Sequence, residues 1–313
     1  MELTANFKSN DLHYESGAPA ILKTKTGNID IHLGVRGMYR LTQCDFPPLK
    51  VMFTKGSKKF EFSGSGSDLK LVTNCGSLYG NQSDQREKVL LEELIYKLYG
   101  SYTDLAFKTK IIEMSYKQSN DKEPFNTSFS FFIEKDSKLA SRCDLKKAKR
   151  KYGSRPVGTW GRNARDFVFT ERTENFNKES LAKLTIFQEL IENFDTGINI
   201  NLNPYYSKAN STQRGGSEKN VKRLVNEGLS QVFLIPYDFD MSNLVNGSRR
   251  SSNFRKWIQN HSNIDLIRPY LLELSNKKEK FMEVLNKSNL NKRSKGNVLK
   301  FLKKKFRELE KSL

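Results

Sequence analysis

The hydrophobic pattern of this chain changes its period near residue 134, and that change constrains the fold more than any other feature. Before residue 134, short runs alternate apolar and polar side chains, as in NIDIHLGVRG (residues 28–37). After it, apolar residues recur at helical spacing, as in KESLAKLTIFQELIENFD (residues 178–195). The first pattern is typical of β-strands and the second of α-helices. The sequence therefore predicts an α+β protein.

The same pattern predicts two lobes that divide near residue 135. A helix that ends at Gly100 is expected at residues 85–100, and further strands are expected at residues 49–53, 59–62, 68–74, 106–116 and 128–135. Residues 1–135 would form a β-rich N-lobe with one helix. Residues 136–313 would form a mainly helical C-lobe.

The formal net charge of +19 favours polyanionic partners such as nucleic acid, nucleotides or acidic surfaces. Part of the excess lies in residues 146–155 and 291–313, which lack the interleaved aromatic residues that stack on bases. A solvated helix face is the simpler interpretation of such runs, so a nucleic-acid partner stays an open alternative.

The sequence also bears on the compartment. It contains no apolar stretch long enough for a membrane span, and its first residues lack the features of a signal peptide. We therefore expect no membrane span, and a cytoplasmic protein as the sequence stands, or an exported one if a signal peptide has been removed. The three cysteines fit neither a disulfide framework nor a zinc site, although Cys44 and Cys75 could pair outside the cytoplasm.

An unusual acidic pair follows the apolar run at residues 232–235. The run stops at Pro236, and Asp238 and Asp240 then flank Phe239. In an extended chain the two carboxylates would lie on one side and Phe239 on the other, so both acids could face one ligand. Mg²⁺ or Mn²⁺ would remove their mutual repulsion, because hard oxygen ligands suit these ions. The alternative is a plain acidic turn after a strand.

Lys70 is the first of several polar residues at suggestive places in the pattern. It lies in a predicted strand, and its neighbours Leu69 and Leu71 face the opposite way. A lysine that points inward needs an anion, and the next helix offers Glu92 beside its apolar stripe and Glu87 nearer the centre.

The order of polar residues along the chain then matches the order of parts in protein-kinase phosphoryl transfer. After Lys70 and the helix glutamate come Asn193 and Asp195 behind a helix, Asn203 downstream, and the acidic pair. In kinases these parts steady the phosphates, orient the hydroxyl and hold Mg²⁺. The chain has no G-x-G-x-x-G loop, H-R-D or D-F-G. A metal-dependent nuclease remains an alternative, although it needs no strand lysine followed by a helix glutamate.

Several stretches in this order resemble the CotH-like (spore coat protein H) atypical protein kinase family. They span residues 34–246 and are VRGMYRLTQCDFPPLKVMF, LKLVTNC, LLEELIYKLYG, FFIEKD, FQELIENFD and IPYDFDMSNLVN. The resemblance implies a two-lobed, protein-kinase-like fold. It also implies ATP and Mg²⁺ or Mn²⁺ as cofactors, and transfer of the γ-phosphate to a protein hydroxyl, of Ser or Thr.

The resemblance also assigns roles to individual residues. Asn193 and Asp195 would be the catalytic element, assisted by Lys70. Asp238 and Asp240 would bind the metal, and the kinase order adds Asn203 to them.

Nucleotide contacts are expected from Lys70, Glu92 and three residues of two further segments. Arg36 and Gly37 lie in LGVRGMYR, which is either a phosphate-covering loop or a loose hairpin. Glu134 lies in FFIEKD, where the backbone would contact adenine unless the segment is simply a buried strand.

The chain departs from the family pattern at three positions. Relatives often have Gly, Trp and His where this chain has Glu192, Thr196 and Leu202. These differences keep open a pseudokinase that binds nucleotide without turnover.

Overall fold

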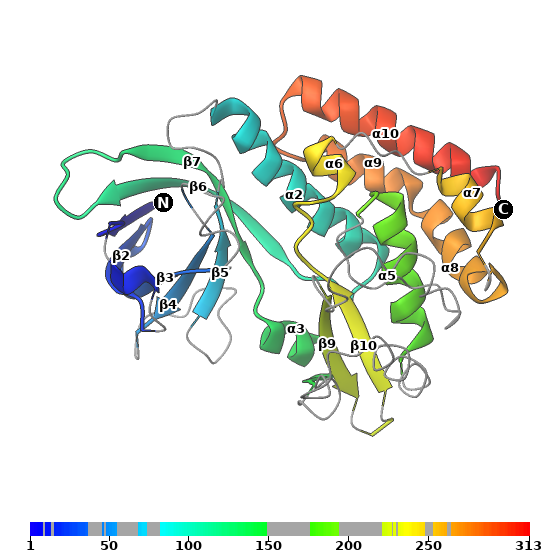
Figure 1. The fold of residues 1–313 in the computed structure, drawn as a ribbon, viewed down its shortest axis with the longest axis horizontal. Coiled ribbons are helices and arrows are strands. Elements are labelled where there is room, and N and C mark those ends of the chain that lie inside the picture. The colour runs from blue at the N-terminus through cyan, green and yellow to red at the C-terminus, as the bar shows by residue number, and fades with distance from the viewer. Residues whose placement is uncertain are drawn as a thin grey trace, which may run out of the picture. The chain divides into compact units, whose positions relative to one another are not determined.

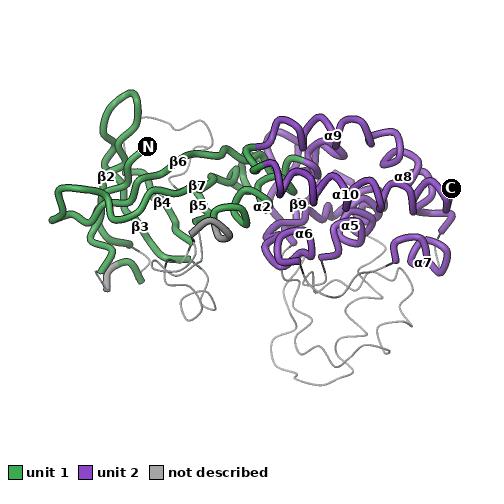
Figure 2. Tube along the Cα trace, turned by 90° about the horizontal axis from the view of Figure 1, so that it is seen from above, with its two compact units in different colours: residues 1–97, 107–139, 289–291 green, residues 98–106, 140–288, 292–313 purple. Residues whose placement is uncertain are grey.

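The computed structural model describes residues 1–8, 10–13, 16–36, 46, 48–54, 68–73, 82–148, 176–193, 221–226, 228–229, 231–247, 253–261 and 264–313. Their contacts divide the chain into two units (Figure 2). Unit 1 comprises Met1–Lys97, Phe107–Leu139 and Asn289–Asn291. Unit 2 comprises Leu98–Ala106, Ala140–Ser288 and Lys292–Leu313. The predicted α+β class is confirmed, because unit 1 is rich in strands and unit 2 is mainly helical.

Unit 1 is built on a closed β-barrel (Figure 1). Its strands are β1 (Glu2–Ala5), β2 (Ala18–Thr24), β3 (Gly27–Val35), β4 (Leu49–Phe53), β5 (Asp68–Val72), β6 (Thr109–Gln118) and β7 (Asn126–Ile133). Neighbouring strands follow the order β1-β2-β3-β4-β5-β7-β6, and β1 pairs in parallel with β6. The sheet expected for a kinase-like N-lobe is thus corrected to a barrel. The reason is that β1, which was not predicted as a strand, joins the two edges and removes them.

Alternating side chains fill the barrel. Fully buried examples from five strands are Leu3, Leu22, Leu33, Val51 and Leu71. Because successive side chains in a strand point to opposite faces, this pattern fixes which residues face the interior and which face outward.

Tyr116 brings a polar group into the barrel. Its ring is fully buried and packs edge-on against Phe46 at a centroid distance of 4.7 Å. Its hydroxyl forms a hydrogen bond with the buried Ser130 hydroxyl of β7. Burial raises the pKa of Tyr116, so the phenol stays protonated. Both buried hydroxyls are therefore satisfied by each other.

One helix covers part of the outer face of the barrel. This helix, α2 (Gln82–Tyr102), places Tyr96 against Phe131 of β7 at a centroid distance of 5.8 Å. The Thr109 hydroxyl of β6 also donates to the Glu93 carboxylate of α2, at 3.1 Å. Strand β7 is therefore buried on both faces along its last residues. Two further helical segments, η1 (Asn10–His13) and α3 (Asp136–Arg142), add to the single helix that was expected.

Unit 2 combines a small antiparallel sheet with helices. The sheet has the order β10-β9-β8, with β8 (Lys146–Lys147), β9 (Val221–Asn226) and β10 (Gln231–Pro236). The helices of the described part are α5 (Lys178–Leu190), α6 (Asn243–Asn246), α7 (Phe254–Gln259), α8 (Ile264–Asn276), α9 (Lys278–Asn286) and α10 (Lys292–Glu310). Leu181 and Leu184 of α5 pack on the apolar side chains of β9 and β10.

A chain of aromatic rings forms the centre of unit 2. Phe187 of α5 packs against Tyr99 at 4.8 Å, Phe239 at 6.1 Å and Phe281 at 6.5 Å, measured between ring centroids. Phe281 in turn packs against Phe306 of α10 at 5.5 Å. These contacts join the end of α2 to α5, α9, α10 and the segment that follows β10.

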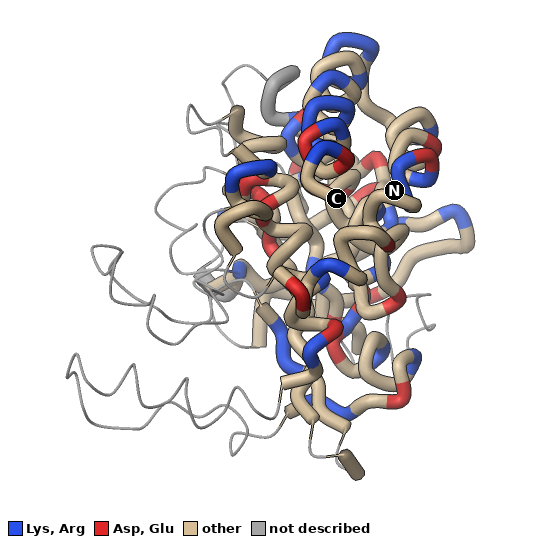
Figure 3. Tube along the Cα trace, turned by 90° about the vertical axis from the view of Figure 1, so that its right-hand side faces the viewer, with Lys and Arg blue, Asp and Glu red and all other residues tan. Residues whose placement is uncertain are grey.

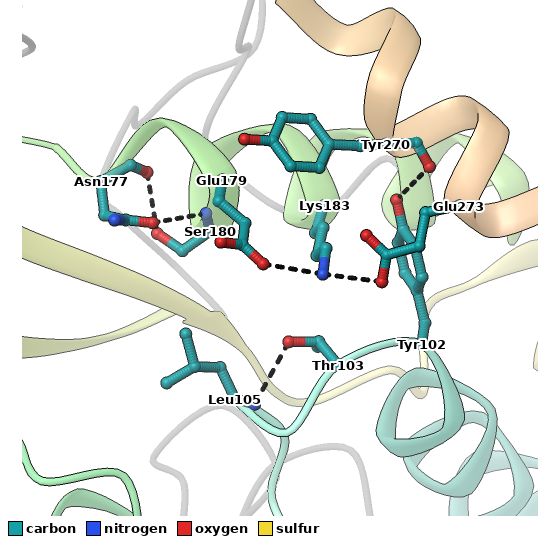
Figure 4. Close-up of polar contacts among 9 residues, drawn as sticks. All are labelled: Tyr102, Thr103, Leu105, Asn177, Glu179, Ser180, Lys183, Tyr270 and Glu273. Atoms are coloured by element: carbon teal, nitrogen blue, oxygen red, sulfur yellow. Dashed lines mark hydrogen bonds and ion pairs between the residues drawn. The ribbon is translucent and has the colours of Figure 1, made fainter.

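A buried lysine ties α5 to α8 (Figure 4). The ammonium of Lys183 lies 2.8 Å from Glu179 Oε1 and 2.9 Å from Glu273 Oε1. Burial by itself would lower the pKa of Lys183, but hydrogen bonds to the two carboxylates raise it. Beside this cluster, the Tyr102 hydroxyl donates to the Tyr270 carbonyl at 2.8 Å. The end of α2 is therefore also held against α8.

In the described residues, no helix combines the length and apolarity needed to cross a bilayer. Cys44, Cys75 and the strand expected at residues 59–62 lie outside the described residues.

The paired hydroxyls inside the barrel generate a stability prediction. Tyr116→Phe should lower the free energy of unfolding by about 1–2 kcal/mol, because it leaves the buried Ser130 hydroxyl without its partner. Adding Ser130→Ala should cost less than it does in the wild type, which a double-mutant cycle in urea measures. Ser115→Ala is the matched control, since Ser115 pairs with Thr127 on the exposed side of the same strands. Additive effects of Tyr116→Phe and Ser130→Ala would contradict the pairing.

Candidate functional site

The residue between the two aspartates after β10 is a core residue. Phe239 is fully buried and packs edge-on against Phe187 of α5. Asp238 and Asp240 are both half-buried. The burial of Phe239 holds the flanking aspartates at the boundary between core and solvent.

The backbone of this segment is a turn and not the extended chain that the sequence suggested. Asp238 has a φ of 63°, in the left-handed region. The Ser242 amide donates to the Phe239 carbonyl at 3.0 Å, and the Asn246 side-chain amide donates to the Asp240 carbonyl at 2.6 Å. Strand alternation ends at Pro236 because the chain turns here into α6. That both carboxylates face one ligand therefore stays a prediction that no longer rests on alternation.

The turn that carries Asn193 closes the end of α5. The Asn193 amide donates to the Gln188 carbonyl at 2.9 Å, and the Glu192 amide donates to the Glu189 carbonyl at 3.2 Å. Glu192 has a φ of 55°. These two hydrogen bonds and the left-handed residue define a Schellman motif. Glycine usually occupies the position that Glu192 has here. Glu192 thus adopts the conformation of the glycine expected from the family resemblance.

Hydrogen bonds join this turn to the acidic segment. The Asn243 amide, at the start of α6, donates to the Glu192 carbonyl at 3.1 Å. The Asn243 side-chain amide also donates to the Glu192 carboxylate. Two segments that are distant in sequence, one with Asn193 and one with Asp238 and Asp240, are therefore linked within unit 2.

Lys70 lies on the outer face of the barrel. The prediction that Lys70 points inward is wrong, because Leu69 and Leu71 point into the barrel and alternation turns Lys70 the other way. Its ammonium lies 3.5 Å from Asp136 Oδ1 and 5.8 Å from the centre of the Phe107 ring. Sequence reasoning missed Asp136, although it follows the FFIEKD glutamate by two residues.

Two more lysines surround a second aspartate on the same face. Lys50 is the cross-strand neighbour of Lys70, and its ammonium lies 3.8 Å from Asp68 Oδ2. Lys135 donates a hydrogen bond to Asp68 Oδ1. Burial by itself would raise the pKa of Asp68, but the Lys135 hydrogen bond and the charges of Lys135, Lys50 and Lys70 lower it. Together with Asp136, this cluster has three cations and two anions, so it carries net positive charge.

Two further residues predicted to contact the nucleotide, Glu92 and Glu134, lie on other elements of unit 1. Glu92 is buried on α2, and the adjacent Glu93 forms an ion pair with Lys97 at 2.8 Å. Glu134 is buried after β7; its amide donates to the Lys108 carbonyl at 2.9 Å and its carboxylate accepts from the Lys108 amide at 3.1 Å. These bonds fasten the start of β6 to the end of β7.

Of the remaining predicted site residues, Arg36 lies in the described part of the chain. Arg36 follows β3, and its amide donates to the Pro48 carbonyl at 2.8 Å. Gly37, Asp195 and Asn203 lie outside the described residues.

The donor set after β10 suits a hard divalent cation. Among the described residues, no group of three or more His, Cys, Asp or Glu side chains is arranged to hold a metal ion. Two half-buried carboxylates are nonetheless what Mg²⁺ commonly takes from a protein, because substrate phosphates and water complete its shell. Asp238 and Asp240 therefore fit a metal that is bound together with a phosphate ligand.

Neither a protein-family model nor a curated protein matches the sequence. Among solved structures, the crystal structure of the Helicobacter pylori proinflammatory kinase CtkA is similar to this chain, with a TM-score of 0.45 and 8% sequence identity. The alignment covers 100% of this chain and 96% of that chain. A likeness at this level does not establish a shared function.

The lowered pKa of Asp68 predicts a pH dependence of stability. A carboxylate whose folded-state pKa is depressed stabilises the fold above its unfolded pKa, about 3.9, and loses that contribution as pH falls through the folded pKa. Asp68→Asn should therefore be less stable than the wild type at pH 7, and the difference should shrink below about pH 4. Urea titrations at several pH values measure this. Asp30→Asn, at an exposed position of β3, is the control, and a pH-independent difference for Asp68→Asn would contradict the prediction.

Proposed function

We propose that this protein is a Mg²⁺- or Mn²⁺-dependent kinase that transfers the γ-phosphate of ATP to a Ser or Thr hydroxyl of a protein. The observation that carries the proposal is the link between Asn243 and Glu192. It joins the turn with the predicted catalytic asparagine to the segment with the predicted metal ligands. Phosphoryl transfer needs these two functions side by side, because the hydroxyl must approach a phosphate that the metal has already fixed.

In this proposal the acidic segment binds the metal–nucleotide complex. Asp238 and Asp240 would hold the cation with Asn203, and the bound cation would neutralise phosphate charge. The burial of Phe239 supports this role, because it fixes the backbone on either side and so preorganises the two carboxylates for the cation.

Asn193 and Asp195 would act on the acceptor. Asp195 would accept a hydrogen bond from the substrate hydroxyl and take its proton during transfer. Asn193 would hold the same element in place from the closed turn at the end of α5.

Unit 1 would contact the nucleotide. Lys70 would bind phosphate oxygens, and Asp136 and Glu92 would hold its ammonium in reach. The net positive charge around Asp68 supports an anionic ligand at this face. Arg36 and Gly37 would cover the phosphates. Since the Glu134 amide already donates to Lys108, an adenine contact there would use the Glu134 carbonyl as acceptor.

Metal-dependent nucleotide binding predicts a thermal shift. ATP with Mg²⁺ at a hundredfold excess over Kd should add about 2.7 kcal/mol to the free energy of unfolding. ATP with EDTA should add much less. Asp238→Asn, which keeps size but removes charge, should abolish most of the Mg²⁺-dependent part, whereas Asp121→Asn in the exposed β6–β7 hairpin should keep it. An equal shift with and without EDTA would count against the metal site.

The catalytic assignment predicts a separation of binding from turnover. Asp195→Asn should keep its affinity for ATP, since its role operates during transfer, while autophosphorylation falls about 10²-fold or more. Affinity is measured by titration and transfer with labelled ATP. Equal loss of ATP affinity in Asp195→Asn and Asp238→Asn would contradict the two roles. ATP binding by the wild type without any transfer would instead identify a pseudokinase.

A further inference from the structure

We propose that Lys305 of α10 is a positioning residue, which holds the turn with Asn193 in place through the Glu192 carboxylate. The catalytic consequence of this inference rests on the proposed function, whereas its structural part does not. Lys305 belongs to the basic run at residues 291–313. Figure 3 shows how densely Lys and Arg recur along the helix that ends at the C-terminus.

Lys305 differs from its neighbours in this run by its burial. It is 0% exposed, whereas Lys303 and Lys304 are exposed. Its ammonium lies 2.7 Å from Glu192 Oε1, and Glu192 is 1% exposed. A buried ammonium is costly unless a carboxylate pairs with it, so each of these two residues requires the other.

The surroundings of Lys305 fix its direction. Its ammonium lies 5.8 Å from the centre of the Phe254 ring and 5.7 Å from that of Phe301. A second carboxylate, Glu308 Oε2, lies 3.9 Å away and accepts from the Phe254 amide at 3.0 Å. The lysine is thus confined by α7 and α10, and Glu192 is confined with it.

Glu192 needs an external tether because its backbone is in an unfavourable region. A left-handed conformation at a residue other than glycine costs free energy and persists only when surrounding contacts hold it. The ion pair with Lys305 and the two hydrogen bonds with Asn243 are such contacts. Asn193 follows directly, so its position depends on the same tether.

The acidic segment depends on this tether less. Phe239 is anchored in the aromatic core, and the Phe239 and Asp240 carbonyls accept hydrogen bonds from Ser242 and Asn246. Loss of the Lys305–Glu192 pair should therefore disturb the catalytic turn more than nucleotide binding. Replacing a buried ion pair by uncharged residues is often neutral for stability, so the Lys305–Glu192 pair can position the turn without being needed for net stability.

The test removes the pair without leaving a buried charge. Lys305→Met alone leaves the buried Glu192 carboxylate without its lysine, and Glu192→Gln alone leaves the Lys305 ammonium with only the more distant Glu308 carboxylate, so each should lower Tm by several degrees. The double variant Lys305→Met/Glu192→Gln buries neither charge, so its Tm should return close to that of the wild type. In this folded double variant, the amides of Asn193 and Asn243 should exchange with deuterium at least tenfold faster, relative to the β9 and β10 amides. The kcat should fall about tenfold or more, with KM for ATP within about twofold.

The matched control is Lys278→Met/Glu310→Gln. Lys278 and Glu310 join α9 to α10 at 2.7 Å, but their side chains are 37% and 45% exposed, so exchange, kcat and Tm should stay as in the wild type. If the amides of Asn193 and Asn243 exchange at the wild-type rate in Lys305→Met/Glu192→Gln, the proposal is overturned. If the wild type transfers no phosphate, the proposed function fails, and the exchange measurement alone still decides whether Lys305 positions the turn.

Discussion

The burial of Phe239 is the contact on which the arrangement of unit 2 depends. Its ring lies against Phe187, which also contacts Tyr99 and Phe281. Because rings in such a core are close-packed, the segment after β10 has little freedom to shift. The two aspartates on either side of Phe239 are too polar to follow it inward and stay half-buried. An apolar anchor between two acids therefore fixes charged groups at the surface of the core.

Charged pairs complete the arrangement by joining elements that are distant in sequence. Lys183 links α5 to α8, and Lys305 links α10 to the turn after α5. Lys70 links β5 to the start of α3. In a chain with a net charge of +19, these three lysines stand out because they are buried or half-buried. A carboxylate partner is required in such a low-dielectric environment, whereas an exposed lysine is stable in water with or without one.

The local elements were predictable where the pattern was regular. Strands β3, β4 and β7 and helices α2 and α5 lie at the residues expected from their periods. Barrel closure was not predictable, because the parallel pairing of β1 with β6 has no signal in nearby residues. Alternation correctly set Lys70 opposite Leu69 and Leu71, but not which side faces the barrel interior, and its partner Asp136 depends on where α3 begins in space.

The candidate site shows the same division. The strand that stops at Pro236 followed from its apolar run. The left-handed backbone of Asp238 and Glu192 was not predictable, because neither residue is a glycine or asparagine, the types that favour this conformation. The pairing of Glu192 with Lys305 joins residues that are distant in sequence, and only the folded chain brings them together.

The most direct test of this account is to locate the cation. Crystals grown with Mn²⁺ and a non-hydrolysable ATP analogue would reveal the metal by its anomalous scattering. The account predicts an anomalous peak within coordination distance of the Asp238 and Asp240 carboxylates and in contact with the analogue's phosphates. Nucleotide bound with no Mn²⁺ at these two carboxylates, or Mn²⁺ and nucleotide bound at another place, would contradict it.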